Sequence, residues 1–154
     1  MEAMLRYAPE TIMRDARAQY FRRSGFAEDG GYGDRWVRLK SGSRTVFVFP
    51  NTERRVRAVR LHDLHHVLTE YDTTWVGEAE IGAWELGAGC GRHWPAWVLN
   101  FGAVAVGLLL APRRVVRAFV RGRRSGTLYA GEFAEELLDR TVGELRASLP
   151  IAPG

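Results

Sequence analysis

A run of sixteen residues without a charged side chain, 96–111, constrains most strongly what this chain can fold into. A helix that spans a bilayer needs about 20 consecutive apolar residues, so this run is too short for that role. Such a helix must be covered by protein, form the wall of a pocket for a long apolar ligand, or dip into a membrane interface. We expect a buried central helix around which the rest of the chain packs.

Most of the remaining sequence has apolar residues at helical spacing, and one short segment does not. A first helix is predicted up to Gly25, and further helices follow residue 52, with breaks near 72–74, 89–95, 112 and 125–131. The runs 36–39 and 45–49 flank Ser41-Gly42-Ser43 and predict a β-hairpin. Because two strands alone are marginally stable, we expect this hairpin to lie on the helices.

The predicted architecture is mainly α, a single helical domain over 1–154 with a small N-terminal β-hairpin. An N-terminal helix and the hairpin occupy 1–57, and a helical core occupies 58–154. The single cysteine, Cys90, excludes an internal disulfide framework, and we expect it to be a small packed residue.

The charge of the chain is +4, and 21 of its 22 basic residues are arginines, since Lys40 is the one lysine. The guanidinium group of arginine forms paired hydrogen bonds with carboxylates and phosphates, which favours anionic partners. No zinc finger or ribonucleoprotein signature is present, so we expect no nucleic-acid partner. Directly after 96–111 lies a cluster that would contact lipid headgroups or phosphates, or would simply be a solvated face: Arg113, Arg114, Arg117 and Arg121.

A helix near the middle of the chain carries the candidate chemistry. His62, Asp63 and His66 fall within about 100° of arc on it, and leucines fill the opposite side. Side chains at i and i+4 stand one above the other, so both imidazoles can point at one centre. Asp63 can reach that centre or hold an imidazole in the right tautomer. An ordinary amphipathic surface helix would show the same pattern.

Glu78 favours the metal-binding interpretation. It lies early in the next predicted helix, so a helical hairpin brings it beside His66. We therefore expect a metal site between two consecutive helices, held by His62, Asp63, His66 and Glu78, with Asp63 and Glu78 as the catalytic candidates. Imidazoles and carboxylates suit zinc, with iron or manganese as alternatives. Three residues are candidates for supporting these ligands from behind: His65, Glu70 and Glu85.

The order H-D-x-x-H, eleven residues and then E, at His62, Asp63, His66 and Glu78, resembles the motif of the coenzyme Q (ubiquinone) biosynthesis protein Coq-four family. The segments 62–71 and 77–86 are similar to bacterial members, and 135–146 is similar to the C-terminal helix of the family. The resemblance extends from about residue 60 to the end. The first fifty residues do not match, so the chain would be a short, divergent, bacterial-type member.

This resemblance implies a helical fold with zinc at those four positions. It also implies cytoplasmic location, with peripheral attachment to the inner face of the membrane that holds the quinone pathway. The implied activity is a metal-dependent, lyase-type oxidative decarboxylation of a polyprenylated hydroxybenzoate, or organisation of the biosynthetic complex. The metal would polarise the ring carboxylate, and the apolar run 96–111 would help to house the prenyl tail.

The implied partners are prenylated aromatic or other isoprenoid lipids, an anionic membrane surface, other quinone-biosynthesis proteins and, as a further option, a second copy of the chain. Two other functions stay open. The chain could bind a prenyl lipid as a scaffold without turnover. It could also be an unrelated zinc hydrolase, which would need an open coordination position and a base such as Glu70 or Glu85.

Overall fold

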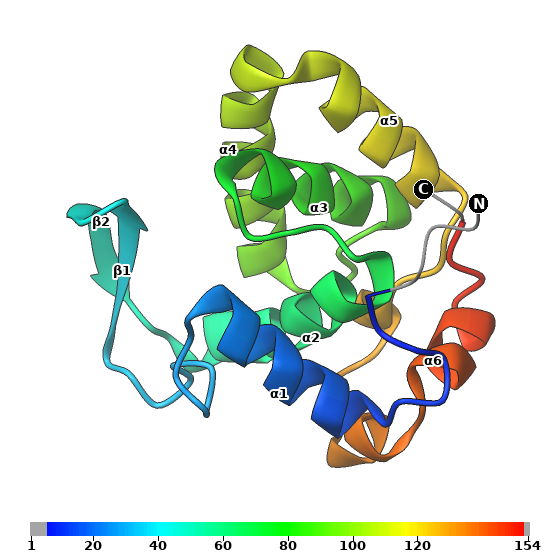
Figure 1. Cartoon of the computed structure of the whole chain (residues 1–154). Coiled ribbons are helices and arrows are strands. Elements are labelled where there is room, and N and C mark those ends of the chain that lie inside the picture. The colour runs from blue at the N-terminus through cyan, green and yellow to red at the C-terminus, as the bar shows by residue number, and fades with distance from the viewer. Residues whose placement is uncertain (1–5, 153–154) are drawn as a thin grey trace.

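The computed structural model describes residues 6–152 and is mainly helical, as predicted (Figure 1). Its helices are α1 (Met13–Ser24), α2 (Glu53–Thr69), α3 (Trp75–Ala88), α4 (Trp94–Leu110), α5 (Pro112–Arg123) and α6 (Val142–Ser148). Two 3₁₀ turns, η1 (Leu128–Ala130) and η2 (Glu135–Asp139), connect α5 to α6, and the strands β1 (Trp36–Ser41) and β2 (Arg44–Pro50) lie between α1 and α2.

Local signals explain where the helices begin and end. Gly25 ends α1 in the left-handed conformation, at φ 70°, where a side chain would be strained. Thr52 and Thr74 begin α2 and α3, each accepting a hydrogen bond from a backbone N–H of the first turn. Thr141 and Glu144 form a capping box at the start of α6. The predicted breaks are therefore confirmed.

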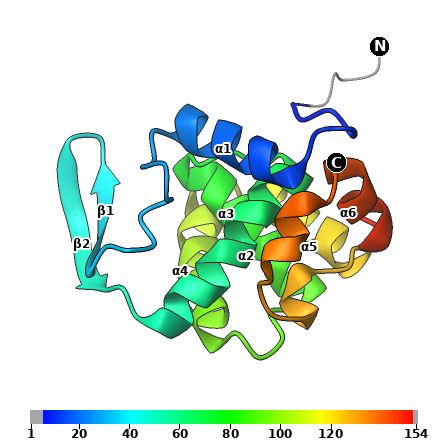
Figure 2. The same cartoon turned by 90° about the horizontal axis from the view of Figure 1, so that it is seen from below.

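Helix α3 lies between α2 and α5, and α4 packs across it (Figures 1 and 2). The approach of α3 to α5 is close because glycines face the neighbouring backbone. A Cβ on Gly122 would lie 2.1 Å from the carbonyl oxygen of Trp84, and one on Gly87 would lie 2.4 Å from that of Phe119. Side chains at these two positions would force the helices apart.

Three clusters of buried side chains make up the core. The largest joins α1, α2, η2 and α6, and a second lies where α2 meets the chain around Cys90, which is a free, fully buried thiol as expected. The third holds α3 against α5. The first cluster thus anchors α2 and the third anchors α3, the two helices that carry the candidate ligands.

The strands β1 and β2 pair antiparallel, with Trp36 opposite Pro50 and Ser41 opposite Arg44. The expectation that the hairpin lies on the helices is wrong, because it stands away from them in both views (Figures 1 and 2). Its side chains are correspondingly exposed, Phe47 by 63%. The physical reason is that η2 and α6 already cover the apolar sides of α1 and α2.

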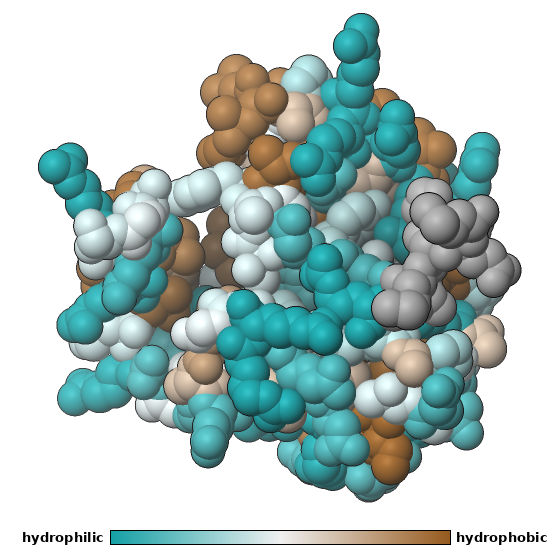
Figure 3. All heavy atoms as spheres, viewed as in Figure 1, coloured by the Kyte–Doolittle hydropathy of each residue, from teal (hydrophilic) through white to brown (hydrophobic). Residues whose placement is uncertain are grey.

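Helix α4 departs from expectation as well. Only Pro95, Ala96, Asn100 and Gly107 are buried on it, whereas Leu109 is 87% exposed. The helix packs on α3 through its small residues, since a Cβ on Gly107 would lie 2.2 Å from that of Ala79. Its large apolar side chains therefore point outward, and hydrophobic atoms gather where α4 turns into α5, at the top of Figure 3. None of the helices between residues 6 and 152 has both the length and the hydropathy needed to cross a bilayer.

Candidate metal centre

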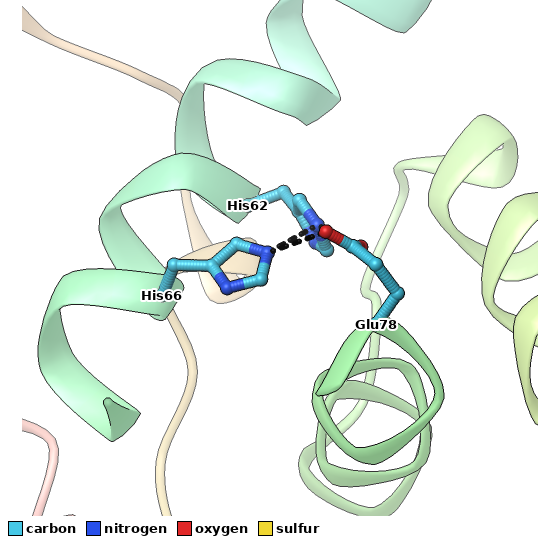
Figure 4. A group of neighbouring side chains, drawn as sticks. All are labelled: His62, His66 and Glu78. Atoms are coloured by element: carbon cyan, nitrogen blue, oxygen red, sulfur yellow. Dashed lines mark hydrogen bonds and ion pairs between the residues drawn. The ribbon is translucent and has the colours of Figure 1, made fainter. Parts of the chain in front are cut away.

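Two consecutive helices bring the candidate ligands together, as predicted. His62 and His66 lie one turn apart on α2, and the connection 70–74 reverses the chain so that Glu78, in the first turn of α3, meets them. Figure 4 shows both imidazoles pointing from α2 toward the carboxylate of Glu78. Among the described residues, these three form a group whose ligand atoms all lie within 4.8 Å of one another.

The distances within this triad are short. The Nε2 atoms of His62 and His66 lie 3.1 Å apart. The Glu78 carboxylate oxygens lie 3.4 Å from the Nε2 of His62 and 3.3 Å from that of His66 (Figure 4). The side chain of Glu78 is 36% exposed and that of His62 19%, so the site opens to solvent on one side.

The hydrogen bonds behind the imidazoles fix their tautomers. The Nδ1 of His66 lies 2.9 Å from the carbonyl oxygen of Tyr71, which can only accept, so this nitrogen carries the proton. The Nδ1 of His62 lies 2.9 Å from the Glu85 carboxylate and donates to it in the same way. In the neutral form both Nε2 atoms therefore present lone pairs to each other and to Glu78. Three acceptor atoms meet with no donor between them, which is an arrangement that a cation stabilises.

The pKa shifts of His62 and Glu78 reflect this close approach of acceptor atoms. Burial alone would lower the pKa of His62, but the carboxylates of Glu85 and Glu78 raise it well above the ordinary 6.5. Burial would raise the pKa of Glu78, and the facing imidazoles of His66 and His62 instead hold it well below its usual range. Without a metal, His62 therefore takes up a second proton and serves as the cation of the site.

Glu85 is the supporting carboxylate of the centre. It is fully buried and receives four hydrogen bonds. One oxygen accepts from His62 and from the Nδ1 of His65, 2.7 Å away; the other accepts from Asn100 at 2.7 Å and from the Tyr129 hydroxyl at 3.2 Å. Burial would raise the pKa of Glu85, but the facing imidazoles of His62 and His65 lower it. The carboxylate is therefore ionised and saturated, and it holds His62 in place.

His65, a candidate for supporting the ligands from behind, does so only through Glu85. Its Nε2 accepts the backbone N–H of Leu128 at 3.0 Å, so both ring nitrogens are occupied. Burial lowers the pKa of His65, which keeps the ring neutral. It ties α2 to η1 rather than facing the triad.

The structure does not bring Asp63 into the triad. Its carboxylate accepts the hydroxyls of Tyr20 at 3.4 Å and Tyr32 at 2.5 Å. Burial raises the pKa of Asp63, partly offset by His62 and by the Tyr32 hydroxyl. Tyr20 also stacks on His66, with ring centroids 5.1 Å apart. Asp63 thus supports the site through two tyrosines on the far side of the ligands.

The remaining predicted site residues lie outside the triad. Glu70 ends α2 in the left-handed conformation and forms an ion pair with Arg146 at 3.0 Å. On α5, Arg114 pairs with Glu80, and Arg121 donates to the carbonyl oxygens of Ala152 and Thr69. The other two arginines of that cluster, Arg113 and Arg117, are exposed.

Four polar residues of this centre are not indicated by the motif or by its spacing: Tyr20, Tyr32, Asn100 and Tyr129. Each lies at least 15 residues from the group to which it bonds, so no local spacing could indicate it. Asn100 did carry a signal, because it is the single amide in the run 96–111. A lone amide in so apolar a helix calls for a buried polar partner.

Comparison with protein-family models and with curated proteins finds no match to this chain. The resemblance carried by the 62–78 motif therefore stays a prediction. What the structure establishes is a mainly helical fold and a group of two histidines and one glutamate that could hold a metal ion.

Proposed function

We propose that this chain is a zinc protein of ubiquinone biosynthesis that acts on a polyprenylated hydroxybenzoate at a membrane surface. The observation that carries the proposal is the meeting of three acceptor atoms, from His62, His66 and Glu78, with no donor among them. The resemblance of the H-D-x-x-H and E motif to the ubiquinone-biosynthesis family is the reason for assigning this chemistry to the quinone pathway.

The spacing of the ligand atoms favours zinc. Zinc bonds of about 2.0–2.1 Å in a tetrahedral array separate the ligand atoms by roughly 3.3–3.4 Å. An octahedral array with bonds of that length, as for magnesium, separates neighbouring ligands by only about 2.9 Å. The distances from the imidazoles to the two oxygens of Glu78, 3.3 and 3.4 Å, match the tetrahedral values, whereas the 3.1 Å between the two Nε2 atoms lies midway between the two arrays.

Two histidines and one glutamate leave a fourth tetrahedral position for water or substrate, which is typical of catalytic rather than structural zinc. Bound there, zinc would supply a Lewis acid for an oxygen of the substrate. Glu78 and Glu85 together balance its charge of +2, which lowers the penalty of placing the ion in a largely buried site. Oxidative decarboxylation releases carbon dioxide and two electrons, so an external two-electron oxidant must complete it.

The outer face of α4 and α5 supports a membrane location and a prenylated substrate. Exposed apolar side chains include Phe101, Leu109 and Phe119, and the arginines Arg113 and Arg117 flank the helix turn. Apolar groups beside arginines suit an anionic bilayer surface. A groove of about 160 Å³ between α3, α4 and α5 has only apolar lining residues: Ala83, Leu86, Val104, Leu108, Val115, Val116 and Phe119.

This exposed face also keeps the scaffold function as a second candidate, since a prenyl lipid could be held without turnover. The hydrolase is less well supported, because both bases proposed for it are occupied. Glu85 is saturated by four donors, and Glu70 is paired with Arg146. A hydrolytic water would have to be activated by the metal alone.

Deleting the gene and measuring quinones and their precursors tests the proposal. We expect loss of ubiquinone and accumulation of the carboxylated prenyl precursor, restored by the wild-type gene but not by His66→Ala. A histidine variant outside the centre, His93→Gln, should restore the quinone and serves as the control. Normal quinone in the deletion strain would contradict the proposal. Full complementation by His66→Ala would instead support the scaffold function.

A further inference from the structure

Three half-buried arginines lie around the hydrogen-bonded pair Tyr32–Asp63 near the base of the hairpin: Arg17 and Arg60, whose charges act on Tyr32, and Arg55, which is close enough to feel the charge of Asp63. Within residues 6–152, four other arginines have a carboxylate within 4.0 Å, but these three do not. Arginines that lose part of their hydration are normally paired with an anion. Among the described residues, no carboxylate lies within ion-pair distance of these three guanidinium groups, although the charge of Asp63 acts on Arg55 from farther away.

Each guanidinium is held by aromatic rings instead. Arg60 lies between Tyr32 and Phe133, 5.1 and 5.2 Å from their centroids. Arg17 lies over Phe21 at 5.6 Å, and Arg55 over Phe49 at 5.4 Å. Stacking uses the flat face of a guanidinium and leaves the N–H donors at its edge free for an acceptor.

Two Nε donors lack a partner in the part of the chain that the structure describes but are covered in this conformation, so an anion would reach them only after the side chains shift. The Nε atoms of Arg55 and Arg60 are inaccessible to solvent and have no acceptor among the described residues. Burial lowers the pKa of Arg55, and Asp63 is the acid whose charge opposes this shift. Asp63, whose carboxylate accepts from Tyr20 and Tyr32, supplies one negative charge, which cannot balance three arginines.

Tyr32 connects this arginine cluster to the metal centre. Its ring packs against Arg60, while its hydroxyl donates to Asp63, the residue after the ligand His62. The loop that carries Tyr32 is fixed by Asn51, whose amide donates to the carbonyl oxygens of Gly31 and Asp34. Asn51 in turn accepts from Arg55 at 2.6 Å, so loop and arginine are positioned together.

We propose that Arg17, Arg55 and Arg60 form a binding site for the anionic group of a ligand, either a carboxylate or a phosphate monoester. Forked donors on a rigid aromatic support match the oxygen geometry of both groups. That this ligand is the substrate of the metal centre rests on the proposed function; the anion site itself does not.

Isothermal titration of the full chain with inorganic phosphate and, separately, with benzoate tests the site at constant ionic strength. We expect saturable 1:1 binding of at least one probe, and the tighter of the two identifies the ligand as a phosphate or a carboxylate. Arg60→Gln and Arg17→Gln should each weaken it about tenfold or more, the effect of losing one charge-assisted contact. Arg22→Gln, an exposed arginine on the same helix as Arg17, is the matched control and should bind normally.

Absence of saturable binding to either probe, or equal weakening in Arg22→Gln, would overturn the proposal. If Arg60→Gln fails to fold, because it removes the stack between two rings, Arg17→Gln decides the matter. Titration of His66→Ala with the same two anions, together with zinc analysis of the wild type, separates the anion site from the proposed metal function. Retained anion binding together with no zinc in the wild type would refute the metal function and leave the anion site standing, and zinc binding without anion binding would do the reverse.

Discussion

At the scale of single residues, Glu85 determines how well His62 can act as a ligand. It is fully buried, receives four hydrogen bonds and holds the proton of His62 on Nδ1, which leaves the lone pair of Nε2 directed at the triad. Such carboxylate–histidine pairs behind a metal orient the ring and raise its basicity. Glu85 is thus a positioning residue and not a ligand.

Glu85→Gln should weaken zinc binding about 10- to 100-fold, because the neutral amide is a poorer acceptor for His62. Competition against a chromophoric chelator measures the affinity. Glu80→Gln, on the same helix but paired with Arg114, is the matched control and should leave the affinity unchanged. Equal affinities in wild type and Glu85→Gln would show that Glu85 is merely structural.

The metal-free protein should become less stable as the pH rises. The pKa of His62 is raised well above 6.5, so its contribution is complete below 6.5 and is lost as the pH passes the folded-state value. The pKa of Glu78 is lowered, so its contribution is complete above about 4.5 and is lost only as the pH falls from there toward the folded-state value. Thermal melts of the chelated protein should show a melting temperature that falls as the pH rises above about 6.5.

Zinc should reverse this trend, because metal binding competes with the second proton on His62. Its affinity, and the stabilisation it brings, should rise over the same pH interval. His62→Gln should flatten both dependences. A metal-free protein whose melting temperature rises with pH, parallel to that of His62→Gln, would contradict the proton linkage.

At the scale of elements, the hairpin and α4 show where apolar surface is left uncovered. Beyond its base, the hairpin pairs only with itself, and its side chains are largely exposed. Replacing residues 38–48 with Asn-Gly would join Val37 to Phe49, its partner in the register, through a two-residue turn. The base, including Phe49 beneath Arg55, would remain.

This shortened chain should keep its helical circular dichroism and bind zinc normally. Its free energy of unfolding should change by only about 0.5 kcal/mol, since surface changes of this kind touch no core contact. Chemical denaturation followed by circular dichroism checks this expectation. Loss of a cooperative transition would mean that the hairpin supports the helices after all.

Helix α4 should bind lipid through its outer face. Burying a side chain such as Leu109 or Phe101 in a bilayer contributes about 1.5–3 kcal/mol, so Leu109→Gln with Phe101→Gln should weaken vesicle binding about 100-fold or more. Both positions are exposed, 87% and 61%, so the melting temperature should not fall. Flotation with anionic and with neutral vesicles measures this effect.

Arg113→Gln with Arg117→Gln provides the complementary arm of that experiment. Each exposed arginine contributes about 1 kcal/mol at an anionic surface, so this pair should weaken binding to anionic vesicles and leave neutral ones unaffected. Unchanged flotation in both double variants would rule out α4 and α5 as the membrane-binding face.

At the scale of the whole molecule, what could be predicted from sequence was what short-range spacing determines. Helix ends follow from Thr52, Thr74 and Gly25, and the His62–His66 pair follows from one helical turn. The exposure of α4 could not be predicted, because hydrophobicity shows what a side chain prefers and not whether another element is free to cover it.

The long-range hydrogen-bond partners could not be predicted either, because no local spacing in the sequence indicates them. Tyr20 and Tyr32 reach Asp63 from 43 and 31 residues away, and they turn an expected ligand into a support of the site. Tyr129 reaches Glu85 across 44 residues. Only the packing of α1, η1 and the 30–33 loop against α2 brings these groups together.

Elemental analysis of the purified chain, prepared without chelators and offered zinc, iron and manganese together, tests the central claim most directly. The three acceptor atoms predict one zinc ion per chain in the wild type and in the control His93→Gln, and none in His66→Ala or Glu78→Gln. A wild-type chain without stoichiometric metal, or variants that retain it in full, would contradict the claim that His62, His66 and Glu78 hold a cation.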